Sequence, residues 1–236
     1  MADYIVNMSR QKIARIAGIG YLIIIVSGIF AEFFVRSKLI IPGDAGTTAV
    51  NILASEALFR AGIVSDLIML IFDVMVAAAL YILLVPVNKG LSMLAAFFRL
   101  MHSAVYGITL LNLVFVLQVL GGNSYLAVFN SDQLNALAML FLQGHNYGYL
   151  IGLIFFGIHC LLLGYLIFKS GYIPKILGIL MMIACFGYLT DSFAQIFLSN
   201  YSDYAAIFMA IVGIPAIIAE LSLCLWLLFK GVKIQS

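Results

Sequence analysis

Charged residues are scarce in this chain. Asp, Glu, Lys and Arg together make up 9% of its 236 residues, against about 25% in a typical soluble domain. Hydrophobic residues make up 65%, which is more apolar surface than a water-soluble fold of this size can bury. The net charge of +2 is too small to indicate a polyanionic partner. The composition therefore excludes a soluble globular domain, a disordered chain and a nucleic-acid-binding protein.

Cysteine and several catalytic motifs are also sparse or missing. The three cysteines each lie in an apolar run, and an odd number without regular spacing indicates neither a disulfide framework nor a cysteine zinc site. The sequence has no glycine-rich phosphate-binding loop and no serine nucleophile elbow. These absences argue against ATP-driven pumping by this chain alone.

Long apolar runs dominate what is present. A membrane-spanning helix needs about 20 mostly apolar residues, and helices satisfy their own backbone polar groups in lipid. Six segments qualify: about 13–35, 58–86, 91–119, 135–168, 174–198 and 205–229. We predict an all-α polytopic membrane protein, in which residues 1–236 form a single six-helix transmembrane domain in a lipid bilayer.

Basic residues are unevenly distributed between the predicted loops. If the N-terminus lies inside, the inner side holds eight of the twelve basic residues: Arg10, Lys12, Arg15, Lys89, Lys169, Lys175, Lys230 and Lys233. Because Lys and Arg are concentrated in cytoplasmic loops, we expect both termini in the cytoplasm and the protein in the cytoplasmic (inner) membrane. Arg36, Lys38 and Arg60 are expected on the outer side.

The first outer loop, about 36–57, and the fourth span have unusual lengths. Asp44 is placed to cap a short interfacial helix that would run from Ala45 to Arg60. The fourth segment of about 34 residues is longer than a bilayer requires, so it must tilt, project or be interrupted. Its Gly144, Gly148 and Gly152 recur every four residues, which favours close packing against another helix.

Ionisable side chains lie inside the spans, where each is costly unless it faces the bundle interior and finds a partner. By depth they fall into two layers. The outer layer holds Glu32, Asp66, His145 and Asp191, and the inner layer holds Arg99, His102 and His159. Asp73 and Glu220 lie nearer the middle and are grouped with the inner residues as one polar cluster. Helical spacing allows these side chains to turn inward. We predict a shared polar cavity; the alternative is local ion pairs, such as Asp73 with Arg99, that only fix helix packing.

Three kinds of chemistry fit these residues. His145, Asp66 and Asp191, together with Glu32, offer ligands for a divalent metal such as zinc, which would activate water against a lipid ester or amide. His102 and His159 offer a less favoured bis-histidine haem site. Buried carboxylates and imidazoles also form polar binding sites and proton relays in membranes.

Two parts of the sequence carry a family resemblance. They are Pro42-Gly43-Asp44 with Thr48, Asn51, Ser55 and Phe59-Arg60, and the stretch 155–191 with Gly164-Tyr165-Leu166, Gly171-Tyr172-Ile173-Pro174 and Gly187-Tyr188-Leu189. Together they resemble the bacterial membrane-protein family catalogued as domain of unknown function 4386. The resemblance implies six spans and no particular activity, and it draws the outer loop into the candidate site.

The leading functional hypothesis is the binding or transport of a small amphipathic molecule, or a lipid. Asp66, His145 and Asp191 would contact its polar group, with Arg60, Asp44 and Asn51 near the outer mouth. Two alternatives stay open: a membrane-embedded metal-dependent hydrolase acting on a lipid, and a non-catalytic sensor or partner subunit. The sequence carries no signal for an oligomeric state.

Overall fold

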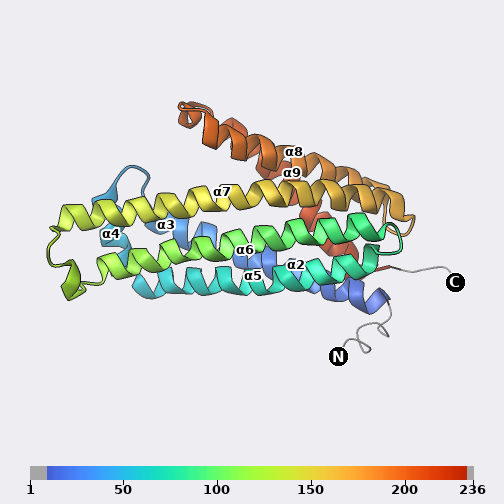
Figure 1. Ribbon diagram of the computed structural model, residues 1–236, viewed down its shortest axis with the longest axis horizontal. Coiled ribbons are helices and arrows are strands. Elements are labelled where there is room, and N and C mark those ends of the chain that lie inside the picture. The colour runs from blue at the N-terminus through green and yellow to red at the C-terminus, as the bar shows by residue number, and fades with distance from the viewer. Residues whose placement is uncertain (1–9, 233–236) are drawn as a thin grey trace. The chain divides into compact units, whose positions relative to one another are not determined.

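A computed structural model describes residues 10–232, which form helices and turns and contain no strand. Six helical stretches are long and apolar enough to span a membrane. They are α2 (Arg10–Ile29) with its continuation η1 (Phe30–Arg36) and α3 (Ser37–Leu39), α5 (Glu56–Leu84), α6 (Lys89–Leu120), α7 (Ser131–Ser170), α8 (Lys175–Phe197) and α9 (Ala205–Phe229). The predicted all-α, six-span fold is confirmed, with each span within a few residues of its expected position (Figure 1).

The first span extends further than the sequence predicted. Beyond Ile29 the chain continues as the π-helix η1 and then as α3, so the helical stretch reaches Leu39 instead of ending near residue 35. A π-helix is a rare, wider winding of the backbone that is often found at functional sites. Its consequence here is that Arg36, expected in the outer loop, lies in a helix and is largely buried.

The predicted interfacial helix is present but shorter. Helix α4 (Ala45–Ala54) is capped by Asp44, whose Oδ1 accepts a hydrogen bond from the Thr47 backbone N–H at 2.9 Å, as expected. At Ser55 the backbone leaves the helical region (φ −130°, ψ 38°). The expected extension to Arg60 is therefore wrong, because residues 56–60 form the first turns of α5.

Helix α7 is continuous over 40 residues, which corresponds to about 60 Å. Of the three outcomes expected for the long fourth span, interruption is excluded, and tilting or projection beyond the hydrocarbon layer remains. Helix α9 likewise continues through Pro215.

The chain divides into two compact units. Within the described residues, the first unit comprises 10–23, 71–103 and 151–232, and the second comprises 24–70 and 104–150. Four of the long helices, α2, α5, α6 and α7, contribute one part to each unit. Organisation as a single transmembrane domain over residues 1–236 stays a prediction.

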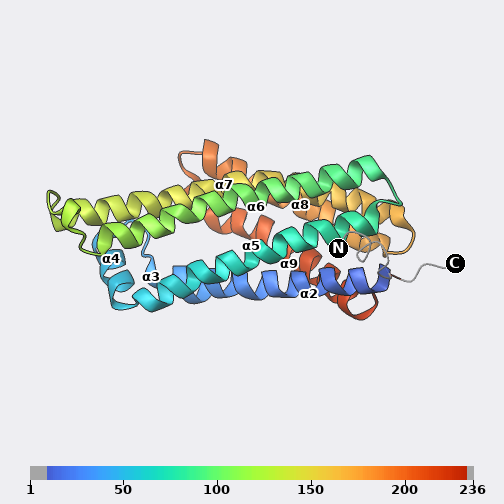
Figure 2. The same ribbon diagram turned by 60° about the horizontal axis from the view of Figure 1, so that its bottom comes forward.

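Small residues bring helices together within each unit. In the second unit, Gly148 of α7 lies against the side chain of Thr109 on α6, and Gly144 lies against Asn112. Figures 1 and 2 both show these parts of α6 and α7 side by side. In the first unit, Gly164 of α7 meets the backbone of Gly178 on α8. The predicted packing role of the glycine stripe is confirmed.

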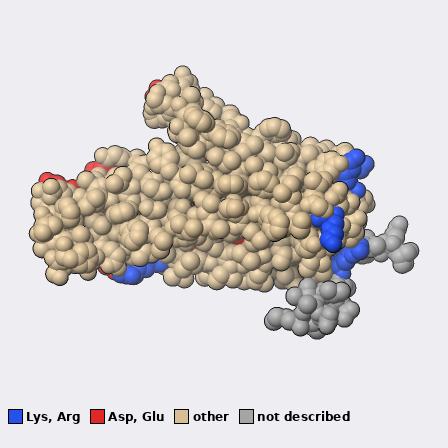
Figure 3. Space-filling model, in the orientation of Figure 1, with Lys and Arg blue, Asp and Glu red and all other residues tan. Residues whose placement is uncertain are grey.

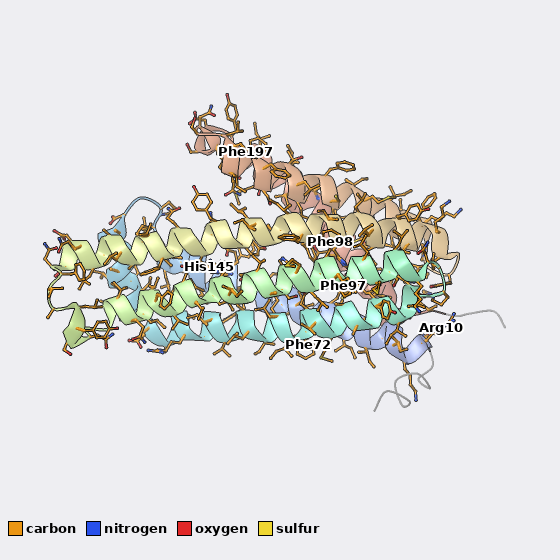
Figure 4. All side chains as sticks on the ribbon, in the orientation of Figure 1. Arg10, Phe72, Phe97, Phe98, His145 and Phe197 are labelled. Atoms are coloured by element: carbon orange, nitrogen blue, oxygen red, sulfur yellow. The ribbon has the colours of Figure 1, made fainter. Side chains whose placement is uncertain are left out.

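The helices expose many large apolar side chains. Phe97 on α6 is 56% exposed and Phe197 on α8 is 76% exposed, and both are labelled in Figure 4. A soluble protein rarely exposes so many large apolar groups together. These helix faces therefore suit contact with lipid chains.

Candidate functional site

The second unit contains a mostly buried polar group that we call the Asp66 cluster: Glu32, which lies at its exposed edge, with Arg36, Asp66, Tyr106 and His145. Its centre is the carboxylate of Asp66, which is fully buried. Arg36 Nη1 donates to Asp66 Oδ2 at 2.5 Å, and the Tyr106 hydroxyl donates to Asp66 Oδ1 at 2.8 Å. Both carboxylate oxygens are thus engaged, as burial of a charge requires.

Arg36 connects two carboxylates. Besides Asp66, its Nε donates to Glu32 Oε2 at 2.8 Å. The Glu32 side chain is 54% exposed, whereas that of Arg36 is 13% exposed. Arg36 was not expected in the site, because the apolar run of the first span ends just before it. Its spacing of four residues from Glu32, favourable for a helix-surface pair, was the signal that could have placed it in the helix.

His145 completes the cluster on α7 (Figure 4). It is buried, and its ring centroid lies 5.8 Å from that of Tyr106. Its Nε2 atom is buried and has no hydrogen-bond partner among residues 10–232. An unpaired buried polar atom costs about 1–3 kcal/mol, so this nitrogen is the least satisfied atom of the cluster.

The first unit contains a second buried group, the Arg99 cluster: Tyr21, Asp73, Arg99, Ser103 and His159. Arg99 Nη2 lies 2.6 Å from Asp73 Oδ1, and both side chains are almost fully buried. Ser103 Oγ donates to the other oxygen of Asp73. Arg99 Nη1 donates to the Tyr21 hydroxyl at 2.9 Å. The ion pair between Asp73 and Arg99, given above as a local packing alternative, is therefore formed.

His159 uses both of its ring nitrogens in this cluster. Nδ1 lies 2.9 Å from the Ala95 carbonyl oxygen, which only accepts, so Nδ1 carries the proton. Nε2 then accepts from Arg99 Nη1 at 3.2 Å. His102 packs its ring on Phe156, with 5.0 Å between centroids. With both nitrogens of His159 engaged, this arrangement gives no support to a bis-histidine haem site.

Glu220 of α9 is also held in the first unit. The hydroxyl of Tyr188 on α8 donates to its carboxylate. The ring of Phe156 connects this pair to the Arg99 cluster, because it contacts the Tyr188 ring at 5.2 Å and the Arg99 guanidinium at 5.3 Å. The structure thus brings the predicted inner residues together, and it adds Tyr21 and Ser103, which sequence reasoning missed because neither carries a formal charge.

Asp191 has its own local partners. It accepts from Gln195 Nε2 at 3.0 Å and from the Tyr201 hydroxyl at 2.7 Å. Burial and the nearby Asp191 carboxylate raise the pKa of Tyr201 above its usual value. Asp191 belongs to the first unit, whereas Asp66 and His145 belong to the second.

The outer-loop candidates also have structural partners. Arg60 Nε donates to Glu56 Oε1 at 2.7 Å on the exposed surface of α5. Asn51 Nδ2 donates to the Leu39 carbonyl at 3.3 Å, which ties α4 to α3. Asp44 is engaged as the cap of α4, and its hydrogen bonds from Thr47 lower its pKa below the usual range.

Metal binding gains no geometric support. In residues 10–232 no group of three or more His, Cys, Asp or Glu side chains is placed to hold one ion. The proposed ligand set His145, Asp66 and Asp191 is not among such groups, and the lipid-hydrolase hypothesis built on it gains no support.

The described part of the first unit contains a small cavity and a larger groove. The small cavity, with a volume of about 10 Å³, is lined by His159, Ser92, Tyr81 and apolar side chains, and this volume is close to the minimum for one water molecule. The larger groove of about 370 Å³ lies beside the α5–α6 turn and the end of α7. Neither is lined by a residue of the Asp66 cluster.

Six apolar spans around buried polar side chains define a multi-pass helical membrane protein. The chain belongs to the family described as Domain of unknown function (DUF4386), whose model matches residues 16–231, so the resemblance noted above is confirmed. A relative from Archaeoglobus fulgidus, named "Uncharacterized protein", is 36% identical over 173 residues, which is 73% of this chain and 85% of the relative. No solved structure matches the chain.

Proposed function

We propose that the chain binds a small amphipathic molecule and carries it across the membrane, with the Asp66 cluster receiving the polar head. The observation that carries this proposal is the buried Nε2 atom of His145, unpaired within the described residues, beside Tyr106. A ligand group that hydrogen-bonds this nitrogen removes the cost of leaving it unsatisfied. A hydroxyl fits best, since it both donates and accepts and so suits either tautomer of His145.

The charges of the cluster restrict the ligand further. One guanidinium, that of Arg36, is shared between the carboxylates of Asp66 and Glu32. The cluster therefore has one positive charge for two negative ones, and a further anion would be repelled by the two acids. The proposed ligand has a neutral or cationic head that carries a hydroxyl group.

The remaining predicted residues take different parts in this proposal. Arg60 belongs to the same unit, and its side chain is 59% exposed, which suits a place on the ligand's path of approach. Asp44 and Asn51 hold α4 in position through the contacts described above. Asp191 is satisfied by Gln195 and Tyr201 and is not part of the proposed site.

A photolabelling experiment tests the binding step. The full chain is reconstituted in phosphatidylcholine liposomes with a monoacylglycerol that carries a diazirine in its acyl chain. We expect labelling of peptides from α5, α6 and α7, and about tenfold weaker labelling in His145→Phe, which keeps an aromatic ring but loses the hydrogen-bonding nitrogen. Gln143→Ala, at an exposed position on the same helix, is the matched control and should label as the wild type does.

Transport across the membrane is tested with the same monoacylglycerol probe. Albumin added outside the liposomes extracts monoacylglycerol from the outer leaflet, so transport is measured as faster extraction of probe that was loaded on the inside. Asp66→Asn, nearly isosteric and uncharged, should slow this extraction. The proposal is refuted if His145→Phe and Asp66→Asn both elute as folded protein, are photolabelled as strongly as the wild type, and allow the probe to be extracted at the wild-type rate.

A further inference from the structure

The groove of about 370 Å³ in the first unit lies where two spans end. One wall is the turn between α5 and α6, formed by Pro86, Val87 and Asn88. The other wall is the last turn of α7, which ends at Ser170, together with Tyr172 just beyond that helix. Helix ends of transmembrane spans lie at the level of the lipid headgroups. The groove is therefore placed to receive a headgroup rather than an acyl chain.

Most polar groups of the groove are already bound within the protein. Asn88 Oδ1 accepts from the Leu91 backbone N–H at 2.9 Å, and Ser170 Oγ donates to the Ile167 carbonyl at 2.8 Å. The Tyr172 hydroxyl donates to the Leu83 carbonyl at 2.5 Å. These bonds fix the walls, so the groove does not depend on a ligand for its shape.

Lys169 supplies the charge that faces a ligand. It lines the groove and is exposed, and within residues 10–232 it forms no ion pair with an acidic side chain. Its ammonium lies 5.9 Å from the centroid of the Tyr165 ring, which also lines the groove. A lysine and a tyrosine at the end of a span form the typical pairing of charge and aromatic ring at the membrane interface.

The surroundings of the groove are basic, and no acidic residue of the described chain lines it. Lys89 begins α6 and Lys175 begins α8, directly after the two turns at this end of the first unit. Figure 3 shows Lys and Arg side chains gathered at this end. Burial raises the pKa of Tyr172, while the positive charge of Arg10 opposes the rise, which indicates that Arg10 lies nearby as well.

We propose that this groove binds the phosphate-bearing headgroup of an anionic phospholipid, with Lys169 contacting the phosphate. The volume lies within the usual range of ligand pockets, about 300–1,000 Å³. Basic pockets between transmembrane helices are suited to anionic headgroups. The site belongs to the first unit and is independent of the molecule proposed to bind the Asp66 cluster.

Native mass spectrometry of the purified full chain tests this proposal. The detergent-solubilised protein is titrated with dioleoyl phosphatidylglycerol or dioleoyl phosphatidylcholine, and the affinity of the first lipid bound is measured. We expect phosphatidylglycerol to bind more tightly, and Lys169→Ala to weaken it by about fivefold, the effect of one basic residue near an anionic lipid. Lys169→Arg should retain binding, because the charge is kept.

Lys175→Ala is the matched control. It removes a charge from the same end of the first unit, but Lys175 does not line the groove, and its ammonium lies over the Phe168 ring at 5.3 Å. If Lys169→Ala and Lys175→Ala weaken phosphatidylglycerol binding equally, the proposal is overturned, because the lipid would then be attracted by the basic surface as a whole. Displacement of the lipid by sn-glycerol 3-phosphate at equal concentration would also overturn it, because the ligand would then be a soluble phosphate ester.

Val87→Phe tests the groove itself, since it fills space without changing charge. We expect it to weaken phosphatidylglycerol binding while phosphatidylcholine binding stays unchanged. If Lys169→Ala fails to fold, the proposal is tested with Val87→Phe and Lys169→Arg instead. Undiminished phosphatidylglycerol binding in Val87→Phe contradicts the proposed location.

Discussion

Arg99 illustrates how a charge is accommodated in the first unit. Its guanidinium is completely buried and meets an anion, a phenol and an imidazole, contributed by Asp73, Tyr21 and His159. In an apolar interior the attraction between two opposite charges, here Arg99 and Asp73, offsets the cost of desolvation only when the geometry is good and further hydrogen bonds are made. The neighbouring hydroxyl of Ser103 supplies one of these bonds.

Removing only one member of this pair should be costly. We expect Arg99→Met to lower the free energy of unfolding by about 3–5 kcal/mol, because the Asp73 carboxylate is left buried without its partner. The measurement is unfolding in mixed micelles of increasing denaturing detergent. The double variant Arg99→Met/Asp73→Leu should recover much of the loss, and a double variant as unstable as the sum of the two single variants would contradict this expectation.

Arg60→Gln is the control for Arg99→Met. Arg60 also forms an ion pair, but it is 59% exposed and its partner Glu56 is 45% exposed. Exposed pairs contribute little to stability because solvent screens them. We therefore expect an effect on unfolding too small to resolve.

Asp44 makes the cap of α4 sensitive to pH. Hydrogen bonds from the Thr47 side chain and backbone lower the pKa of Asp44 below its ordinary value of 3.8. A group with a lowered pKa in the folded state stabilises fully above its unfolded pKa, and this contribution is lost as the pH falls through the folded pKa. Amide hydrogen exchange in residues 45–54, corrected for intrinsic rates, should accelerate below pH 3.8. Asp44→Asn, which caps without titrating, should remove that pH dependence.

Helices pack closely where a glycine leaves room for the side chains of the neighbouring helix. A Cβ atom on Gly148 would overlap the side chain of Thr109 on α6. We expect Gly148→Ala to destabilise the protein by about 1–3 kcal/mol through overpacking. The midpoint of thermal unfolding in detergent, followed by circular dichroism, measures the effect.

Two further variants locate this clash. A methyl group added at Gly213 of α9 would meet no atom of the described residues within 4 Å, so Gly213→Ala should be neutral or slightly stabilising, as alanine favours helices. Thr109→Ala should relieve part of the strain in Gly148→Ala. Equal unfolding midpoints for Gly148→Ala and Gly213→Ala would show that the α6–α7 contact is not tight.

For the molecule as a whole, the positive-inside rule predicts which loops share a side of the membrane. Lys89 and Ser124 are exposed residues at opposite ends of α6. In intact cells, a membrane-impermeant maleimide should label Ser124→Cys, and it should label Lys89→Cys only after lysis. The three native cysteines are buried and should contribute little background. The reverse labelling pattern would place both termini outside.

The number and approximate position of the spans could be predicted because hydropathy is a local property of about 20 consecutive residues. The cap of α4 was likewise predictable, since Asp44 and Thr47 are neighbours in the chain. The pairing of Asp73 with Arg99 was foreseen as one alternative among several. The need of a buried charge for an opposite partner suggested it, but that need alone does not determine which face of each helix meets the other.

Three contacts of the polar residues were not predicted in this way. Arg36 reaches Asp66 because the π-helical turn extends the first span, and no apolar run marks such a turn. Asp191 has the same expected depth as Asp66, yet it is bound by Gln195 and Tyr201 close by in sequence. Tyr21 lacks a formal charge, so nothing in its sequence context distinguishes it from other tyrosines.

The sequence by itself determined that this chain crosses a membrane six times as helices, because lipid leaves long apolar segments no other way to satisfy their backbone. Only the tertiary structure decided that Arg36, Asp66, Tyr106 and His145 form one cluster and that Arg99 gathers a different set. Helix rotation and close packing settle those partnerships, and both depend on side chains that are far apart in the chain.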